Sequence, residues 1–121
     1  MKAVFDTNIL IDYLNGVDTA AAEFELYDER LVSVVTQIEV LVGAQGPDEE
    51  RLIRRFLAGF KVMDLDTSVA EQAVALRRQH GLKVPDAIVY ASAREQGCML
   101  VSRNTKDFKT EWPDIRAPYV I

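Results

Sequence analysis

This chain of 121 residues contains one cysteine and one histidine, and their scarcity excludes several kinds of site. A lone Cys98 cannot form a disulfide within the chain, and one cysteine with one histidine cannot supply a Cys/His zinc site. The sequence also has no Gly-rich phosphate loop and no Ser-His-Asp order typical of a hydrolase triad. Any chemistry must therefore come from other side chains.

Long apolar stretches are missing as well. No apolar run approaches the roughly 20 residues that span a bilayer, and the carboxylate at Asp6 comes too early for the apolar region of a signal peptide. We therefore expect a cytoplasmic protein with no segment in a membrane. Because the sequence shows no internal repeat and no linker, and this length can bury one core, we expect a single domain over residues 1–121.

Positive charge is in short supply, with 14 Lys and Arg against 19 Asp and Glu and a net charge of −5. This balance argues against nucleic-acid binding, because affinity for phosphates comes from cationic side chains. Acids that surround a divalent metal ion would still allow phosphate to bind, because the charge of the ion reverses the sign of the local electrostatic potential. Arg103, Lys106 and Lys109 are candidates for contacts with RNA phosphates, although solvated surface charge is the more common role of such residues.

What the chain does have is a regular alternation of strand-like and helix-like segments. Residues 48–60, for example, place Leu52, Ile53 and Phe56 at helical spacing, and Ser68 to Glu71 match a capping box that opens the next helix. Strands that alternate with helices predict βαβ units, and hence an α/β fold whose mostly parallel sheet has helices on both faces. The expected strands are 2–5, 31–35, 61–65, 99–102 and 117–120, and the expected helices are 9–14, 19–28, 37–44, 48–60, 68–80 and 86–96, with a helical turn at 105–108.

Acidic residues follow several of the expected strands. Asp6 comes directly after the first strand, Glu39 lies in the helix after the second, and Asp107 lies in the turn after residues 99–102. Open α/β sheets bind ligands outside the carboxyl ends of their strands, so these acids are expected at one edge. Asp86 begins a helix rich in small residues and is expected to approach the same edge. Gathered carboxylates repel, and a divalent cation with a preference for oxygen ligands, Mg²⁺ or Mn²⁺, relieves the repulsion.

Each of these acids also has a purely structural interpretation. Asp6 fits the N-cap of a helix, Thr36 to Glu39 match a capping box, and Asp86 follows Pro85 in a first helical turn. Asp107 fits a solvated turn. Taken one at a time, these structural roles are at least as common as metal binding, and only the convergence of the four acids at one edge favours a metal site.

Four segments of the chain carry a family likeness: "VFDTNILIDYL", "VTQIEVLVGA", "VPDAIVYASA" and "LVSRNTKDF". In this order, and over nearly the whole length, they resemble the PIN-domain ribonucleases, in particular the VapC toxins of toxin–antitoxin pairs. The resemblance implies that residues 1–121 form a PIN domain with Mg²⁺- or Mn²⁺-dependent endoribonuclease activity. It also implies frequent homodimers and a VapB-type antitoxin that occupies the active site.

The resemblance assigns the family's first three acids to Asp6, Glu39 and Asp86. Because Mg²⁺ and Mn²⁺ prefer oxygen ligands, we expect Asp6 and Asp86 to bind the metal directly, and Glu39 to bind it directly or through water. Thr7 and Ser102 match small hydroxyl positions near the carboxylates, where they would orient the ligands through hydrogen bonds.

The fourth acid is where this chain departs from many relatives, which carry an aspartate at the position of Asn104. Others have an acid three residues later, where this chain has Asp107. We favour Asp107 as the fourth acid, orienting water or a second ion, with Asn104 in a supporting role.

Two other classes of protein compete with the enzyme. One is a catalytically silent PIN-like binding module in which the acids serve mainly as helix caps. The other is a receiver-type phosphoacceptor domain, which should show adjacent acids after its first strand and a lysine after its last. Because Asp6 is followed by Thr7 and Asn8, the receiver ranks last.

Overall fold

The computed structural model describes residues 1–121 and contains one five-stranded sheet with six helices. All strands are parallel, in the order β3-β2-β1-β4-β5. The predicted α/β class with a parallel sheet is therefore confirmed. The strands are β1 (Lys2–Phe5), β2 (Glu29–Ser33), β3 (Lys61–Met63), β4 (Met99–Val101) and β5 (Ile115–Arg116). The helices are α1 (Thr7–Leu14), α2 (Asp18–Glu25), α3 (Val34–Val42), α4 (Pro47–Leu57), α5 (Thr67–His80) and α6 (Val84–Gln96).

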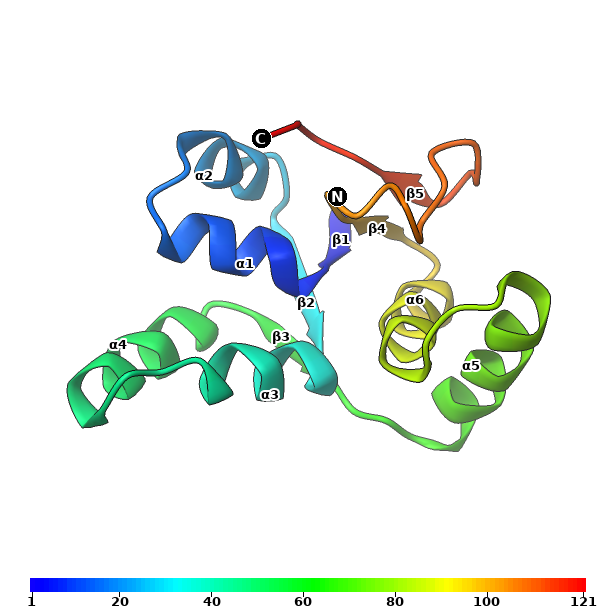
Figure 1. Ribbon diagram of the computed structural model, residues 1–121, viewed down its shortest axis with the longest axis horizontal. Coiled ribbons are helices and arrows are strands. Elements are labelled where there is room, and N and C mark those ends of the chain that lie inside the picture. Colours follow the sequence, from blue (N-terminus) through cyan, green and yellow to red (C-terminus); the bar gives the residue numbers. More distant parts are fainter.

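Helices cover both faces of the sheet, as right-handed crossovers between parallel strands require. Helices α1 to α4 lie on one face and α5 and α6 on the other (Figure 1). Alternate strand residues enter the two cores: Val4 and Leu31 pack with α5 and α6, whereas Phe5 and Val32 pack with α1 to α4. Burial on both faces explains why the strands are short continuous apolar runs. No helix is long and apolar enough to cross a membrane.

The strand order places β1, at the start of the chain, beside β4, which comes near the end of the chain. From β1 the sheet grows through β2 to β3 on one side, and β4 and β5 extend it on the other side, so β1 and β4 flank the point where the order reverses. Phe5 pairs with Val101 in the register of β1 and β4, and the Asp6 amide donates to the Val101 carbonyl at 2.9 Å. The next residues, Asp6 and Ser102, therefore leave the sheet side by side, at the position where such folds bind ligands.

The last strand differs from the sequence prediction. The prediction of a strand over 117–120 is wrong, because the pairing with β4 involves Ile115–Arg116 instead. Pro118 has no N–H to donate to a ladder, which disfavours pairing there. The chain after β5 runs back over α1 and α2, and Tyr119 packs against their core (Figure 1).

Two capping boxes predicted from the sequence are also wrong, because a residue closer to the strand caps each helix. Ser33, the last residue of β2, caps α3 and its Oγ accepts from the Val35 amide at 3.1 Å, so Glu39 lies inside the helix. Asp66 caps α5 and its carboxylate accepts from the Val69 amide at 2.9 Å. Both helices therefore begin earlier than the sequence suggested. The same holds for α1, which begins at Thr7 with Asp6 as its N-cap, and for α6, which begins at Val84 without a side-chain cap.

Candidate active site

Asp6 is the most buried acid at the carboxyl edge of the sheet, with 6% of its surface exposed. It is the N-cap of α1, and its Oδ1 accepts from the Thr7 amide at 2.8 Å. Its Oδ2 accepts from the Ser102 hydroxyl at 2.8 Å and from the Asn8 amide group at 3.2 Å. Asp6 is therefore both the N-cap of α1 and a residue of the candidate site, because capping uses one carboxylate oxygen and the other lies at the β1–β4 edge.

Burial raises the pKa of Asp6 to about 6, in spite of the opposing hydrogen bonds from Ser102 and Thr7. The neighbouring carboxylates of Asp86 and Glu39 make smaller contributions to this raised pKa. No lysine or arginine donates to Asp6. Its negative charge is thus buried with hydrogen bonds but without a cationic partner, which is an unfavourable state for a carboxylate.

Glu39 reaches this edge from the second turn of α3. Its carboxylate is exposed, and its Oε1 accepts from the Thr7 hydroxyl at 2.6 Å. The Thr7 Oγ1 also lies 3.1 Å from the buried Thr36 Oγ1. Thr7, directly after Asp6, thereby links the start of α1 to α3 and orients the Glu39 carboxylate, as expected for a small hydroxyl residue beside the acids.

Asp86 lies in the first turn of α6, which is a buried helix with small residues on its sheet-facing side. Burial is the largest cause of its raised pKa, followed by the negative charges of Asp107 and Glu39. Lys83, at the N-cap of α6, lowers the pKa of Asp86 in return. Asp86 therefore lies within electrostatic range of the other acids, although it comes from the opposite face of the sheet.

Asp107 lies in the turn after β4, together with Asn104. The Asn104 Oδ1 accepts from the Asp107 amide at 3.3 Å, while its amide group donates to the Asp107 Oδ2 at 2.9 Å. The Asn104 backbone amide donates to the Ser102 Oγ at 3.0 Å. Asn104 thus has the geometry of a capping residue that fixes Asp107, and Asp107 faces Asp86 closely enough to raise its pKa.

The structure therefore brings Asp6, Glu39, Asp86 and Asp107 together at one edge, and we call them the acid cluster. No group of three or more His, Cys, Asp or Glu side chains is placed so that it could hold a metal ion. Mg²⁺ is commonly held by one or two carboxylates, with waters and substrate phosphates as its remaining ligands. The donor set of the acid cluster, all oxygen and largely without cations, fits such an ion.

The basic residues predicted to contact RNA have different environments. Lys106 and Lys109 are exposed near the turn that carries Asp107. Arg103 instead binds the Asp12 carboxylate with two hydrogen bonds of 2.8 Å, so its guanidinium is engaged within the protein. Two residues near the acids, Asn8 and Lys83, were not predicted from the sequence. Their spacing could have identified them, since Asn8 follows Asp6 by two residues and Lys83 precedes Asp86 by three.

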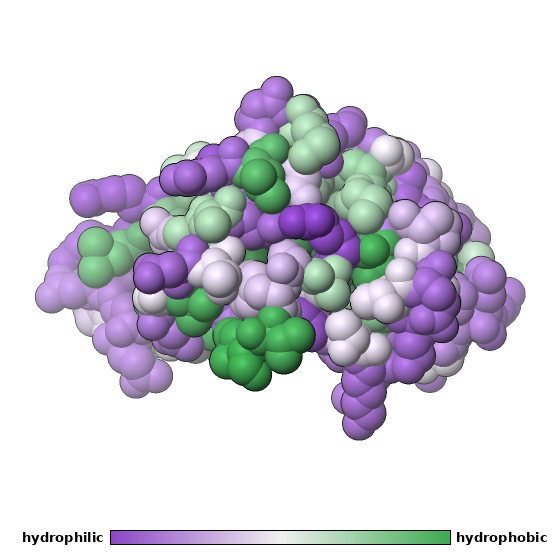
Figure 2. All heavy atoms as spheres, turned by 90° about the horizontal axis from the view of Figure 1, so that it is seen from above, coloured by the Kyte–Doolittle hydropathy of each residue, from purple (hydrophilic) through white to green (hydrophobic).

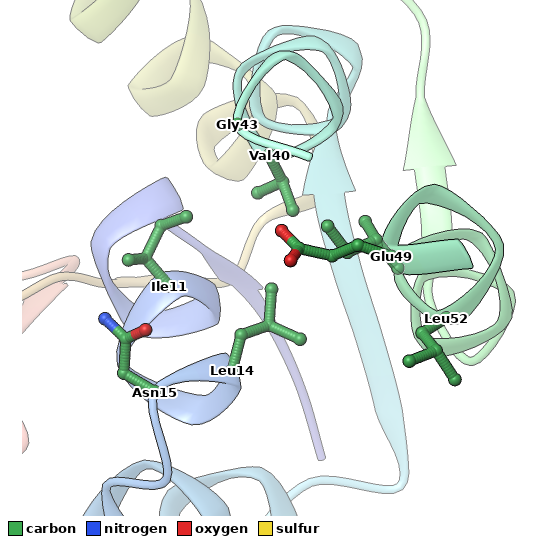
Figure 3. Close-up of a pocket in the computed structure, with 8 residues that line it drawn as sticks. Ile11, Leu14, Asn15, Val40, Gly43, Glu49 and Leu52 are labelled. Atoms are coloured by element: carbon green, nitrogen blue, oxygen red, sulfur yellow. The ribbon is translucent and has the colours of Figure 1, made fainter. Parts of the chain in front are cut away.

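The largest hollow in the surface is separate from the acid cluster. It measures about 400 Å³ between α1, α3 and α4, and Ile11, Leu14 and Leu52 contribute to its apolar lining (Figure 3). The Glu49 side chain extends into it from α4. In the space-filling view from above, hydrophilic residues predominate and apolar residues gather in compact clusters between them (Figure 2). None of the four acids lines this hollow or any of the smaller ones.

Comparisons with known proteins identify the family of the chain. The family model for the PIN domain matches residues 3–110. The tRNA(fMet)-specific endonuclease VapC of Shigella flexneri is 28% identical over 120 residues, which cover 90% of this chain and 91% of that protein. A chain of a toxin–antitoxin complex from Klebsiella pneumoniae is 40% identical with a TM-score of 0.93, and the match covers 98% of this chain and 99% of that one.

A more distant structure shares the fold alone. A chain of VapBC2 from Rickettsia felis, solved with a DNA fragment from their promoter, has a TM-score of 0.80 at 20% identity over 95% of this chain and 96% of that one. The resemblance that the four sequence segments indicated is thus confirmed over nearly the whole length. The chain belongs to the PIN domain family.

Proposed function

We propose that this protein is a Mg²⁺- or Mn²⁺-dependent endoribonuclease and the toxin of a VapBC-type toxin–antitoxin pair. The observation that carries the proposal is the buried Asp6 carboxylate, which has no cationic partner and lies within range of Asp86 and Glu39. A buried charge of this kind is stabilised when a divalent ion binds. The similarity of the chain to an endonuclease VapC over 90% of its length supports phosphodiester hydrolysis as the reaction.

The side chains of the acid cluster have distinct tasks in this proposal. Asp6 and Asp86 hold the ion from the two faces of the sheet, Glu39 holds it directly or through water, and Asp107 orients a water molecule or a second ion. The ion supplies Lewis-acid stabilisation of the charge on the phosphate and lowers the pKa of water.

The hydroxyl and amide side chains keep these carboxylates in place. Thr7 orients Glu39, Ser102 orients Asp6, and Asn104 orients Asp107 through the hydrogen bonds described above. Such supporting hydrogen bonds commonly change metal affinity or activity by about 10- to 100-fold. Lys83, Lys106 and Lys109 are the exposed cations nearest the acids in sequence and are proposed to contact the RNA backbone, where a contact positions the substrate without selecting its sequence.

An antitoxin of the VapB type is the proposed protein partner. Solved structures of the relatives include a toxin–antitoxin complex from Klebsiella pneumoniae and VapBC complexes from Rickettsia felis and Salmonella typhimurium. A homodimer, implied by the family, is the proposed oligomeric state. Co-expression of the chain with the product of a small neighbouring gene, followed by co-purification, tests the partnership.

Cleavage of RNA by the purified protein tests the proposed activity. Transfer RNA is the first substrate to use, because the Shigella flexneri relative is a tRNA(fMet)-specific endonuclease. We expect cleavage in Mn²⁺ or Mg²⁺, none in EDTA, and loss of at least about a hundredfold in Asp86→Asn. Asp18→Asn is the matched control, since it removes an exposed acid from the first turn of another helix and should leave cleavage unchanged. A wild-type protein that neither cleaves RNA nor binds these ions would favour the silent binding module instead.

A further inference from the structure

A second buried aspartate lies on α1, one and a half turns beyond Asp6. Asp12 is 4% exposed, and its two carboxylate oxygens accept from the Arg103 guanidinium at 2.8 Å each. The Tyr119 hydroxyl donates to the same carboxylate at 2.8 Å. These three residues come from α1, the segment after β4 and the chain after β5, and together they form what we call the Asp12 clamp.

The clamp is continuous with the acid cluster through the backbone of Arg103. While the Arg103 side chain binds Asp12, its backbone amide donates to the Asn8 Oδ1 at 3.1 Å. The Asn8 amide group donates in turn to the Asp6 Oδ2 at 3.2 Å and to the Ser102 Oγ at 3.3 Å. Arg103 thus joins its own segment to α1 at two points, one on each side of Ile9–Leu10.

The same segment also determines where Asp107 lies. Residues 102 to 104 carry the Ser102 hydroxyl that binds Asp6 and the Asn104 side chain that binds Asp107. A shift of this segment relative to α1 would change the position of Asp107 relative to Asp6, which is the N-cap of α1. Because a catalytic constellation must be held to within about 0.5 Å, the attachment of the segment to α1 bears directly on the acid cluster.

An equivalent group elsewhere in the protein does not join residues 102–104 to α1, although its arginine also meets this segment in the sheet, where the Arg116 carbonyl accepts from the Ser102 amide at 3.0 Å. Glu23 of α2 is also 4% exposed, and it is bound by the Arg116 guanidinium, with one contact of 2.9 Å, and by the Tyr27 hydroxyl at 3.1 Å. No hydrogen bond links the side chains of this second group to an acid of the cluster. Two buried acid–arginine–tyrosine groups of like composition therefore differ in what they hold: the Asp12 clamp attaches residues 102–104 to α1, whereas the second group attaches β5 to α2.

We propose that Asp12, Arg103 and Tyr119 are positioning residues, which hold residues 102–104 against α1 and so keep Asp6 and Asp107 in register for the metal ion. The inference rests on the proposed function for its effect on metal binding. A partly buried ion pair contributes little net stability compared with an apolar pair of the same size. We therefore attribute to this pair a role in positioning residues 102–104 rather than in stabilising the fold. Two parallel hydrogen bonds from a planar guanidinium fix direction as well as distance.

The test compares Asp12→Asn with Glu23→Gln, each of which replaces one carboxylate oxygen by an amide that opposes its arginine. Three quantities are measured: the melting temperature, Mn²⁺ affinity by calorimetry, and kcat and KM for RNA cleavage. We expect both variants to lose stability, but only Asp12→Asn to weaken Mn²⁺ binding by about tenfold or more and to lower kcat with little change in KM. Arg103→Lys, which keeps the charge and loses the two-pronged contact, should behave like Asp12→Asn to a smaller degree.

Amide hydrogen exchange makes the test independent of metal binding. In Asp12→Asn the amide protons of Arg103 and Asn104 should exchange at least about tenfold faster, whereas in Glu23→Gln they should exchange as in the wild type. If Asp12→Asn fails to fold, Tyr119→Phe removes one hydrogen bond to Asp12 with little change in volume and should show the same pattern more weakly. Unchanged exchange and Mn²⁺ affinity in these variants, or equal changes in Glu23→Gln, would overturn the proposal. A wild-type protein without metal binding or cleavage would overturn the proposed function, while the exchange data would still decide on the clamp.

Discussion

Asp6 and Asp12 are two nearly buried aspartates on one short helix, and their surroundings are opposite. Burial and the nearby acids raise the pKa of Asp6 to about 6. The hydrogen bonds of Arg103, followed by that of Tyr119, lower the pKa of Asp12. Both carboxylates are well supplied with hydrogen bonds, so the difference lies in the presence or absence of a positive charge.

This difference separates a structural acid from a candidate functional one. A buried carboxylate that is paired with an arginine has its charge compensated. Removing either partner leaves the other as an uncompensated buried charge, which is unfavourable. A buried carboxylate without a cation has a perturbed pKa and retains the capacity to bind one, which is the usual condition of residues in active sites. On this criterion Asp6 is a candidate functional acid, whereas Asp12 and Glu23, each bound by an arginine, are structural acids.

The contrast between the two aspartates predicts its largest effect when the charge of Asp6 is removed. We expect Asp6→Asn to lower metal-dependent cleavage by about a thousandfold, because the amide keeps the cap on α1 but loses the charge that binds the ion. Cleavage assays at saturating Mn²⁺, with circular dichroism to confirm folding, measure the effect. Asp66→Asn is the control, since it alters another N-cap aspartate, that of α5, outside the acid cluster. Similar cleavage rates in wild type and Asp6→Asn would remove Asp6 from the essential ligands.

The pH dependence of stability should distinguish the two aspartates by sign. In the folded, metal-free protein the pKa of Asp6 is about 6, above its ordinary value of 3.8, so the folded state holds the proton more tightly than the unfolded state. The associated stability is complete below pH 3.8 and is lost as the pH rises through 6, by about 3 kcal/mol. Asp12 acts in the opposite direction, because its lowered pKa contributes stability at neutral pH that is lost in acid.

Denaturant unfolding in EDTA at several pH values measures this contrast. Between pH 4 and pH 8, the stability of Asp6→Asn relative to wild type should rise, because the variant lacks the charge that destabilises the metal-free protein. The stability of Asp12→Asn relative to wild type should hardly change over this range, and should rise only as the pH falls below 3.8, where the wild type loses the contribution of its ionised Asp12. Parallel curves for Asp6→Asn and wild type would show that Asp6 titrates normally.

Metal binding should compensate for the buried charge of Asp6 and not for that of Asp12. At a free Mn²⁺ concentration about a hundredfold above Kd, we expect the wild type to gain about 2.7 kcal/mol, enough to raise the melting temperature by several degrees. The gain should vanish in Asp6→Asn and persist in Glu23→Gln. Thermal melts with EDTA and with Mn²⁺ measure it, and identical wild-type curves in both would contradict the metal site.

The smallest expected effect concerns the fourth position of the acid cluster. We expect Asp107→Asn to weaken metal-dependent cleavage by about tenfold, because an amide is a poorer ligand than a carboxylate for a hard cation. Asn104→Ala should have a smaller effect, through the loss of the two hydrogen bonds that hold Asp107. Cleavage rates of both variants at saturating Mn²⁺ decide between the residues. Near wild-type activity in Asp107→Asn with loss in Asn104→Ala would assign the position to Asn104.

Much of this architecture was predictable because it depends on local patterns. Apolar runs at the strands, helical spacing between them and the glycines that end α5 and α6 were sufficient to identify an α/β fold. Helix starts were predicted less well, since Ser33 and Asp66 cap their helices earlier than the motifs at Thr36 and Ser68 suggested. Several residues in each of these segments can serve as an N-cap, and the end of the preceding strand determines which one does.

By itself, the sequence determined that acids follow the strands at one edge of a parallel sheet, because side-chain periodicity and strand direction are properties of the local chain. Only the tertiary structure decided that β4 lies beside β1, so that Ser102 reaches Asp6 across 96 residues of sequence. It likewise decided that Asp12 is paired with Arg103 and Tyr119 while Asp6 is not. Strand order and ion pairing depend on contacts between residues far apart in the chain. The environment that separates one buried aspartate from the other therefore forms only when the whole sheet assembles.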